Sequence, residues 1–419
     1  MHLTREEEKM LKSDDYITRI CMESIVKYGD AAGAEKLVDI DGNVVIPTMT
    51  GTTRIPELGI DIAGPEMAGK RLKVFTISRN FGVHDGWEDI GIPPVNDPED
   101  HKRREEMMKP WMRIGVHPIN SCAYYLTQTY LPTAGQYCSW HESSAIPWGN
   151  AILGAKVNFD LGREFAIAYT GKAPAYDMRL DENRVATRLV KCETQLKADM
   201  DYDLFGWFVG EALALEVPVM TGIGKPTQTQ IVKMNTELNT GGQVRMYHVP
   251  GLTPEASSVE AALNYKKPVE TITVKREDLK KAYEKMNYAS DENVDFVYLG
   301  CPFYSLEDLR RAVYYLEGKK CKANLWIVAD PWTFKVGEMM GYRDAIKRAG
   351  GVLLTGACSV VTGLMPPNTD VMAVDACKQD YYITGSAYPR KLEVWYGTMK
   401  DCIDAAVTGK WHGKWPRGT

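Results

Sequence analysis

Several features that would mark a particular class of function are missing from this sequence of 419 residues. Lys plus Arg (50) and Asp plus Glu (55) nearly balance, the net charge is −5, and neither sign forms a long block. That distribution argues against nucleic-acid binding and against an acidic disordered tail. The longest apolar-leaning stretch, 351–365, is shorter than the roughly 20 residues that span a bilayer. We therefore expect a cytoplasmic protein with a small-molecule substrate, and neither nucleic acid nor membrane as a partner.

The N-terminal segment lacks the apolar core of a secretory signal. Thr4 and Glu7 have capping-box spacing instead, which predicts that a helix begins there. The nine cysteines are odd in number and irregularly spaced, so they do not have the pattern of a disulfide framework. We expect their thiols to stay reduced. Complete phosphate-loop, zincin and serine-hydrolase motifs are also missing.

The last third of the chain alternates between strand and helix patterns, which predicts parallel βαβ units. The expected strands cover residues 295–300, 325–329 and 351–355. Ser305 and Asp308 have the spacing of a helix cap after the first strand. In such sheets ligands bind beyond the carboxyl ends of the strands. Cys301 and Cys358 fall at or near those ends.

The N-terminal part is less regular. Strands are expected at 44–47 and 71–76, a β-rich piece at 165–169, and a surface excursion at 85–110. We place a boundary near residue 270. It divides the chain into an α/β region, 1–270, which contributes Cys122 and the Glu142-Ser-Ser motif, and an α/β domain, 271–419, which contributes Cys301 and Cys358.

Three cysteines have sequence contexts typical of turns rather than of apolar helix faces. Cys122, Cys301 and Cys358 each lie beside Gly, Pro or Ser. Turn amides can donate hydrogen bonds to the sulfurs of an iron–sulfur cluster. A set of three cysteines would leave one iron open to a substrate hydroxyl. Two other interpretations stay open at this point: small buried hydrophobic residues, or structural zinc, although no His lies beside any of the three.

Longer motifs resemble those of a known family, aconitase X. The matching segments are 142–158 (ESSAIPWGNAILGAKVN), 180–184 (LDENR), 247–255 (YHVPGLTPE) and 300–302 (GCP) followed by Ser305-Leu. The resemblance extends from Leu3 nearly to the C-terminus. It implies an α/β, multi-domain, aconitase-like large subunit, with the cluster site at a domain interface. It also implies a hydro-lyase whose iron–sulfur cluster, of 4Fe–4S or 2Fe–2S type, is held by three cysteines, here Cys122, Cys301 and Cys358.

Members of the family dehydrate cis-3-hydroxy-L-proline or (R)-5-phosphomevalonate. The family also uses a small swivelling domain, fused in some members and a separate subunit in others. Since this chain matches the large part only, a separate small subunit is implied as its partner. Our first expectation is dehydration of cis-3-hydroxy-L-proline or a close relative, and the alternative is (R)-5-phosphomevalonate. The alternative of another class is a non-catalytic iron–sulfur or regulatory protein.

The resemblance implies roles for four polar residues. Glu142, Ser143 and Lys378 are the expected catalytic residues: Glu142 would hydrogen-bond to the leaving hydroxyl or to the iron-bound water, and Lys378 would neutralise a carboxylate or phosphate. Ser143 and Ser144 would contact the substrate. Without the resemblance, the glutamate and the two serines would be interpreted as helix caps and the lysine as a surface group. The segment around the lysine departs from the family's Ser-Gly-Lys-Ser, because this chain has Ala-Cys-Lys-Gln there. That departure leaves the identity of the substrate open.

A second set of residues corresponds to substrate contacts of the phosphomevalonate branch. Gly51, Thr52 and Thr53 match a Gly-x-Ser/Thr loop whose amides and hydroxyls suit an anion, although an ordinary turn would have the same composition. Asn80 is the fourth expected contact. Around it the chain departs from the family's Thr-Leu-Asn-Pro, and the additional Arg79 would favour an acidic substrate if it faces the site. No catalytic base is identified, and the small subunit could supply it.

Overall fold

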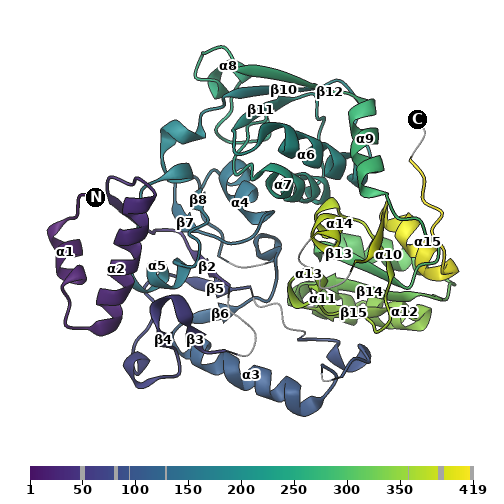
Figure 1. The fold of residues 1–419 in the computed structure, drawn as a ribbon, viewed down its shortest axis with the longest axis horizontal. Coiled ribbons are helices and arrows are strands. Elements are labelled where there is room, and N and C mark those ends of the chain that lie inside the picture. Colours follow the sequence, from purple (N-terminus) through teal and green to yellow (C-terminus); the bar gives the residue numbers. More distant parts are fainter. Residues whose placement is uncertain are drawn as a thin grey trace.

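Two five-stranded sheets and one three-stranded sheet organise the chain in the residues that the structure describes. The structure is a computed structural model, and it describes residues 1–47, 52–79, 84–93, 95–127, 130–356, 358–385 and 391–415. Figure 1 shows the N-terminal sheet at the left and centre, the three-stranded sheet at the top and the C-terminal sheet at the right. Neighbouring strands within these sheets run parallel. The predicted α/β class is confirmed.

The N-terminal sheet has the strand order β6-β5-β2-β7-β8. Its strands are β2 (Val44–Ile46), β5 (Thr76–Ser78), β6 (Val116–Pro118), β7 (Tyr137–Ser139) and β8 (Lys156–Asn158). The helices of this region are α1 (Arg5–Leu11), α2 (Tyr16–Ala31), α3 (Pro98–Arg113), α4 (Ala145–Pro147) and α5 (Glu164–Thr170), and small antiparallel pairs join β1 (Leu37–Asp39) to β9 (Lys172–Pro174) and β3 (Arg54–Ile55) to β4 (Ile60–Asp61). The predicted capping box of Thr4 and Glu7 begins α1.

Three expectations for the N-terminal region differ from the structure. Residues 165–169 form helix α5 rather than a strand; every residue of α5 is buried, so no polar face reveals the helical period. The strand expected at 71–76 begins only at Thr76, because the amides of Lys73 and Val74 donate to the carbonyl of Ala168 beside α5. The surface excursion at 85–110 contains most of α3, whereas the strand expected at 44–47 is present as β2.

The three-stranded sheet places β10 (Arg188–Cys192) between β11 (Pro218–Thr221) and β12 (Glu270–Val274). Its helices are α6 (Asp199–Leu213), α7 (Gln228–Gly242), α8 (Val259–Ala262) and α9 (Arg276–Met286). Helices α6 and α7 pack with their backbones in contact, since a Cβ atom on Gly242 would overlap the carbonyl oxygen of Gly210. The predicted boundary near residue 270 stays a prediction; in the structure that residue begins β12.

The C-terminal sheet has the strand order β15-β14-β13-β16-β17. Its strands are β13 (Phe296–Tyr304), β14 (Asn324–Ala329), β15 (Val352–Thr355), β16 (Val371–Val374) and β17 (Glu393–Tyr396), and its helices are α10 (Leu306–Leu316), α11 (Pro331–Met339), α12 (Tyr342–Ala349), α13 (Ser359–Thr362), α14 (Cys377–Thr384) and α15 (Met399–Thr408). The three predicted strands are therefore present, and Ser305 and Asp308 form the predicted capping box of α10. Strand β13, buried along its whole length, is the centre of the sheet.

Large aromatic side chains fill a separate core beside each sheet. Trp140, Trp207 and Phe334 are fully buried and belong to three different apolar clusters. A further cluster joins the N-terminal region to the C-terminal sheet. Among the helices within the described residues, none has the length and apolar character needed to cross a membrane.

Candidate active site

Three cysteines from distant parts of the sequence come together where the N-terminal region meets the C-terminal sheet. Cys122 lies in the turn after β6, Cys301 lies in β13, and Cys358 is the N-cap residue of α13 beyond β15. Cys122 and Cys301 belong to one buried apolar cluster, and Cys358 packs against it. Burial raises the pKa of each thiol, and the charges of the neighbouring thiols raise the pKa of Cys122 and Cys301 further. The three thiols therefore lie within electrostatic range of one another.

The donor set of this site, three thiols with backbone amides nearby, suits an iron–sulfur cluster. Within the described ranges, no three or more His, Cys, Asp or Glu side chains are arranged to hold one metal ion. In a cluster the cysteine ligands are distributed over several irons, so they need not converge on one point. The backbone amide of Phe303 donates to the Sγ of Cys122 at 3.4 Å, and backbone amides of Val360 and Val361 interact with Cys358. Such amide donors suit thiolate sulfur, whereas the role of the cysteines as ligands stays a prediction.

Glu142 lies between two cations beside the cysteines. Its Oε2 accepts a hydrogen bond from Nη1 of Arg79, and its Oε1 accepts one from Nζ of Lys378. The ammonium of Lys378 also donates to Oγ of Ser143 at 2.7 Å. These side chains are nearly buried, with exposed fractions of 7% for Glu142, 10% for Arg79 and 13% for Lys378. The charge of Glu142 also raises the pKa of the Cys122 thiol, which places this group next to the cysteine site.

The two cations decide the protonation state of the carboxylate. Burial alone would raise the pKa of Glu142, but Lys378 and Arg79 outweigh it and hold that pKa well below the usual range. Burial likewise acts to lower the pKa of Lys378, while Glu142 and the thiols of Cys301 and Cys122 raise it above its usual value. At neutral pH the site therefore holds an ionised carboxylate between two cations.

The backbone around Glu142 has an uncommon conformation. Its φ is 120°, a region that residues with a Cβ atom rarely adopt. Ser143 donates to the carboxylate of Glu142 from both its amide and its hydroxyl at 3.1 Å. Ser144 is the buried N-cap residue of α4, but its side chain makes no capping hydrogen bond. Backbone strain of the kind seen at Glu142 is typical of functional sites. The two serines do not act as the helix caps that composition alone would suggest.

The predicted phosphomevalonate-type contacts are only partly covered by the structure. Gly51 and Asn80 lie outside the described residues. Thr52 accepts a hydrogen bond from the indole of Trp111 at its carbonyl, and the hydroxyl of Thr53 donates to Asp61 at 2.7 Å. These contacts run to α3 and to the β3–β4 pair. The structure therefore brings together the three cysteines, Glu142, Ser143 and Lys378, and it records no contact between the two threonines and that group.

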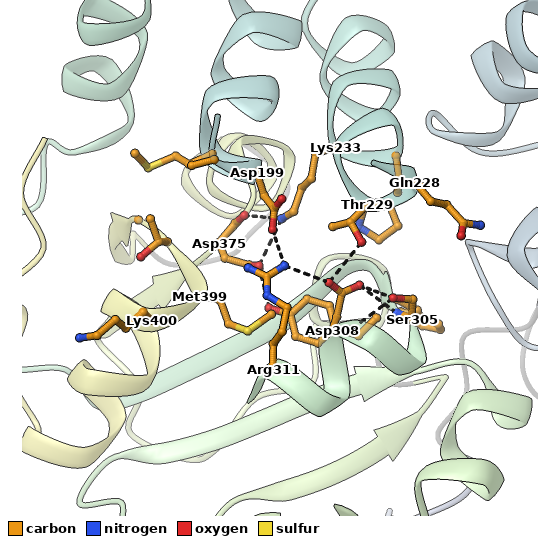
Figure 2. A pocket seen from close by; sticks show the side chains of 18 of the residues that line it. Asp199, Gln228, Thr229, Lys233, Ser305, Asp308, Arg311, Asp375, Met399 and Lys400 are labelled. Carbon is orange, nitrogen blue, oxygen red and sulfur yellow. Dashed lines mark hydrogen bonds and ion pairs between the residues drawn. The ribbon is translucent and has the colours of Figure 1, made fainter. Parts of the chain in front are cut away.

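A cavity of about 380 Å³ is lined by the first turns of α6 and α7 and by residues of α10 and α15 (Figure 2). Arg311 of α10 lies between Asp199 and Asp308 and donates to Asp199 at 2.6 Å. The lining includes Phe303, whose amide contacts Cys122. None of the described residues that line this cavity is among the catalytic, substrate-binding or metal-binding residues predicted from the sequence.

Sequence reasoning missed a group of buried charges behind Lys378. Asp203 in α6 and Lys233 and Glu237 in α7 are buried, as is Asp375 before α14. The sequence carries little signal for them, because α6 and α7 show no clear division into an apolar and a polar face. Arg79 was expected to favour an acidic substrate if it faced the site, but its ion pair with Glu142 was not predicted.

Comparison with known proteins accounts for nearly the whole chain. Residues 1–182, 186–284 and 294–408 match the models of the aconitase X first, second and third domains, respectively. The phosphomevalonate dehydratase large subunit of Methanocaldococcus jannaschii is 30% identical over 417 residues, 96% of this chain and 99% of that protein. The cis-3-hydroxy-L-proline dehydratase of Hypocrea jecorina is 27% identical, and the match covers 94% of this chain and 66% of that protein.

A solved structure shows the same architecture. The holo form of Thermococcus kodakaraensis aconitase X superposes with a TM-score of 0.77 at 28% identity, and the match covers 97% of this chain and 100% of that one. The resemblance found in the sequence motifs is thereby confirmed for each of the three parts of the fold.

Proposed function

Because the chain belongs to the aconitase X family, we propose that it is the catalytic large subunit of an iron–sulfur hydro-lyase that dehydrates a small β-hydroxy acid. The matched relatives are dehydratases, and the chain is accordingly a hydro-lyase. One observation carries the more specific proposal. An ionised Glu142 lies between Arg79 and Lys378, beside the two buried cysteines Cys122 and Cys301 and the partly buried Cys358.

Dehydration of a β-hydroxy acid requires loss of a proton beside a carboxylate or carbonyl and release of hydroxide. Hydroxide leaves poorly at neutral pH unless its charge is taken up. In our proposal Cys122, Cys301 and Cys358 hold the cluster. When bound, the cluster supplies an iron without a cysteine ligand, a Lewis acid suited to the leaving hydroxyl.

The side chains of this chain then have separate tasks. The depressed pKa of Glu142 makes it a weak base, so it is suited to accept a hydrogen bond from the substrate hydroxyl rather than to remove a carbon-bound proton. Lys378, whose pKa is raised, neutralises a carboxylate or phosphate, and Ser143 orients the two groups through its hydroxyl. Since neither Glu142 nor Lys378 suits the role of base, we assign the base to the small subunit.

The substrate is proposed from the relatives. Cis-3-hydroxy-L-proline was our first expectation, and (R)-5-phosphomevalonate is supported by one further observation. Phosphomevalonate dehydratase large subunits are 30% and 31% identical to the chain, whereas the hydroxyproline dehydratase is 27% identical. A separate small subunit as the partner is supported by the relatives that are themselves named large subunits. Gly51, Thr52, Thr53, Asn80 and Ser144 stay predictions as substrate contacts.

The proposal is tested by assaying the large and small subunits together. The pair is purified without oxygen and incubated with each of the two substrates, and loss of water is followed by mass spectrometry. We expect one substrate to be dehydrated. A pair that is loaded with iron and sulfide but converts neither substrate would favour the non-catalytic alternative.

A matched pair of variants ties turnover to the site. Glu142→Gln should lower turnover by about 100-fold or more, because it removes the charged acceptor that positions the substrate hydroxyl, and misplacing a reacting group costs about that much. The control is Glu216→Gln, which makes the same change in an ion pair with Arg188 of β10. Equal activities of the two variants would contradict the role given to Glu142.

A further inference from the structure

The helix that carries Lys378 lacks a cap of its own. Lys378 is the second residue of α14, and the N-cap residue, Ala376, has no side-chain acceptor. Two carboxyl groups of the neighbouring helices replace that cap. The amide of Cys377 donates to Asp203 of α6 at 3.0 Å, and the amide of Lys378 donates to Glu237 of α7 at 2.9 Å. Figure 1 shows α14 beside the lower end of α7, and the two helices pack together.

The segment before α14 is also held from two sides. Asp375 accepts a hydrogen bond from the hydroxyl of Tyr304 in β13 at 2.7 Å, and Lys233 of α7 lies 3.2 Å from its carboxylate. The hydroxyl of Tyr396 donates to Asp203 at 2.9 Å. The first turn of α14 is thus fixed by contacts with α6, α7, β13 and β17.

These carboxyl groups are costly to bury. Asp203 and Glu237 are fully buried, and burial together with their mutual repulsion raises the pKa of Glu237 well above its usual value. Lys233 is the cation that faces both of them. Burying a carboxyl group carries a large desolvation cost, so two of them at this position indicate a role that apolar side chains could not fill. Their acceptor oxygens meet the two backbone amides at the start of α14, where a helix needs partners.

We propose that Asp203 and Glu237 are positioning residues that cap α14 from the second domain and so hold the Lys378 ammonium against Glu142 and Ser143. The part of this inference that concerns turnover rests on the proposed function, since it requires Lys378 to act in the dehydration. The part that concerns position does not. The two carboxyl groups connect the α6–α7 pair, whose backbones are in contact, to the helix α14 that carries Lys378.

The position of Lys378 can be measured without turnover, by the rate at which acetic anhydride acetylates it in the full, anaerobically purified chain. Peptides are quantified by mass spectrometry, with the exposed Lys281 as internal reference. Glu237→Met removes the acceptor. Glu237→Asp keeps the carboxyl group but moves it away from the Lys378 amide by one methylene. It replaces the Met variant in the measurement if the Met variant does not fold. Glu237→Gln keeps an acceptor oxygen in place.

We expect acetylation of Lys378 to rise about five- to tenfold in the Met and Asp variants, the ratio that corresponds to the loss of one helix cap, and to stay unchanged in the Gln variant. The matched control is Asn235→Leu, which removes a different buried hydrogen bond of α7, the one from Tyr247. This control should leave Lys378 protected.

The outcomes separate the two claims. Higher acetylation together with a lower kcat, both restored in Glu237→Gln, supports positioning and the proposed role of Lys378. Higher acetylation with unchanged kcat supports positioning and contradicts that role. Unchanged acetylation in a folded Glu237→Asp chain, or an equal rise in Asn235→Leu, overturns the inference whatever the kinetics show.

Discussion

Because Glu142 contacts two cations, we expect a double-mutant cycle in which the second substitution causes no further loss of stability. Glu142→Gln removes the only negative charge that Arg79 and Lys378 share in the contacts described above, and leaves two nearly buried cations facing each other. Lys378→Met is a milder change, because the carboxylate keeps Arg79 as its partner. Combining the two changes removes the repulsion that the first one creates. The double variant should therefore be no less stable than Glu142→Gln alone.

The magnitudes follow from burial. Removing one partner of a buried pair costs about 3–5 kcal/mol, the range we expect for Glu142→Gln. Loss of one charged hydrogen bond costs about 1.5–3 kcal/mol, the range for Lys378→Met. The double variant should recover at least the cost of Lys378→Met, about 1.5–3 kcal/mol, relative to the sum. Because the pKa of Glu142 is depressed in the folded state, its contribution is complete above the unfolded value of about 4.3 and is lost only as the pH falls through the folded value.

The assay is urea unfolding of the large chain at pH 7, followed by circular dichroism. The control cycle uses Asp278 and Lys281, an exposed pair on α9, where the coupling should be about 0–1 kcal/mol. Simple additivity of Glu142→Gln and Lys378→Met, or a stable Glu142→Gln variant, would refute the shared-partner arrangement.

Three further changes test the frame around the site. Burial raises the pKa of Glu164 from 4.5 to about 7. The free energy of unfolding should therefore fall by about 3 kcal/mol as the pH rises from about 4.5 to about 7. Glu164→Gln should flatten this slope in urea titrations between pH 4.5 and 8, and an unchanged slope would contradict it. Asp160→Asn leaves the fully buried Arg179 without its anion and should cost about 3–5 kcal/mol by the same measurement. Gly242→Ala should force α7 away from α6 and cost about 1–3 kcal/mol, whereas an unchanged melting temperature would show that the helices can separate freely.

The parts of the fold that follow local rules could be predicted from the sequence. In the C-terminal sheet, continuous apolar strands alternate with helices, and the capping box of Ser305 and Asp308 marks where α10 begins. Helix α5 could not be predicted in the same way, because it is buried on all sides and its apolar run has no period to distinguish it from a strand.

The site could be predicted only in part. The turn contexts of Cys122, Cys301 and Cys358 singled out the three thiols, but their meeting depends on how the sheets pack. The ion pair of Glu142 with Lys378 joins residues 236 positions apart, and no local pattern specifies it. Glu237 was missed for the same reason, since it acts on α14 through tertiary contact rather than sequence spacing.

Iron and acid-labile sulfide analysis, with electron paramagnetic resonance of the dithionite-reduced cluster, on the anaerobically reconstituted large and small subunits, tests the central claim most directly. The account predicts a brown protein whose spectrum changes when the hydroxy acid is added. It also predicts loss of that spectrum in Cys122→Ser, Cys301→Ser or Cys358→Ser, but not in the control Cys321→Ser, which lies between α10 and β14. A colourless protein that contains zinc, or a cluster that survives all three substitutions, would contradict it.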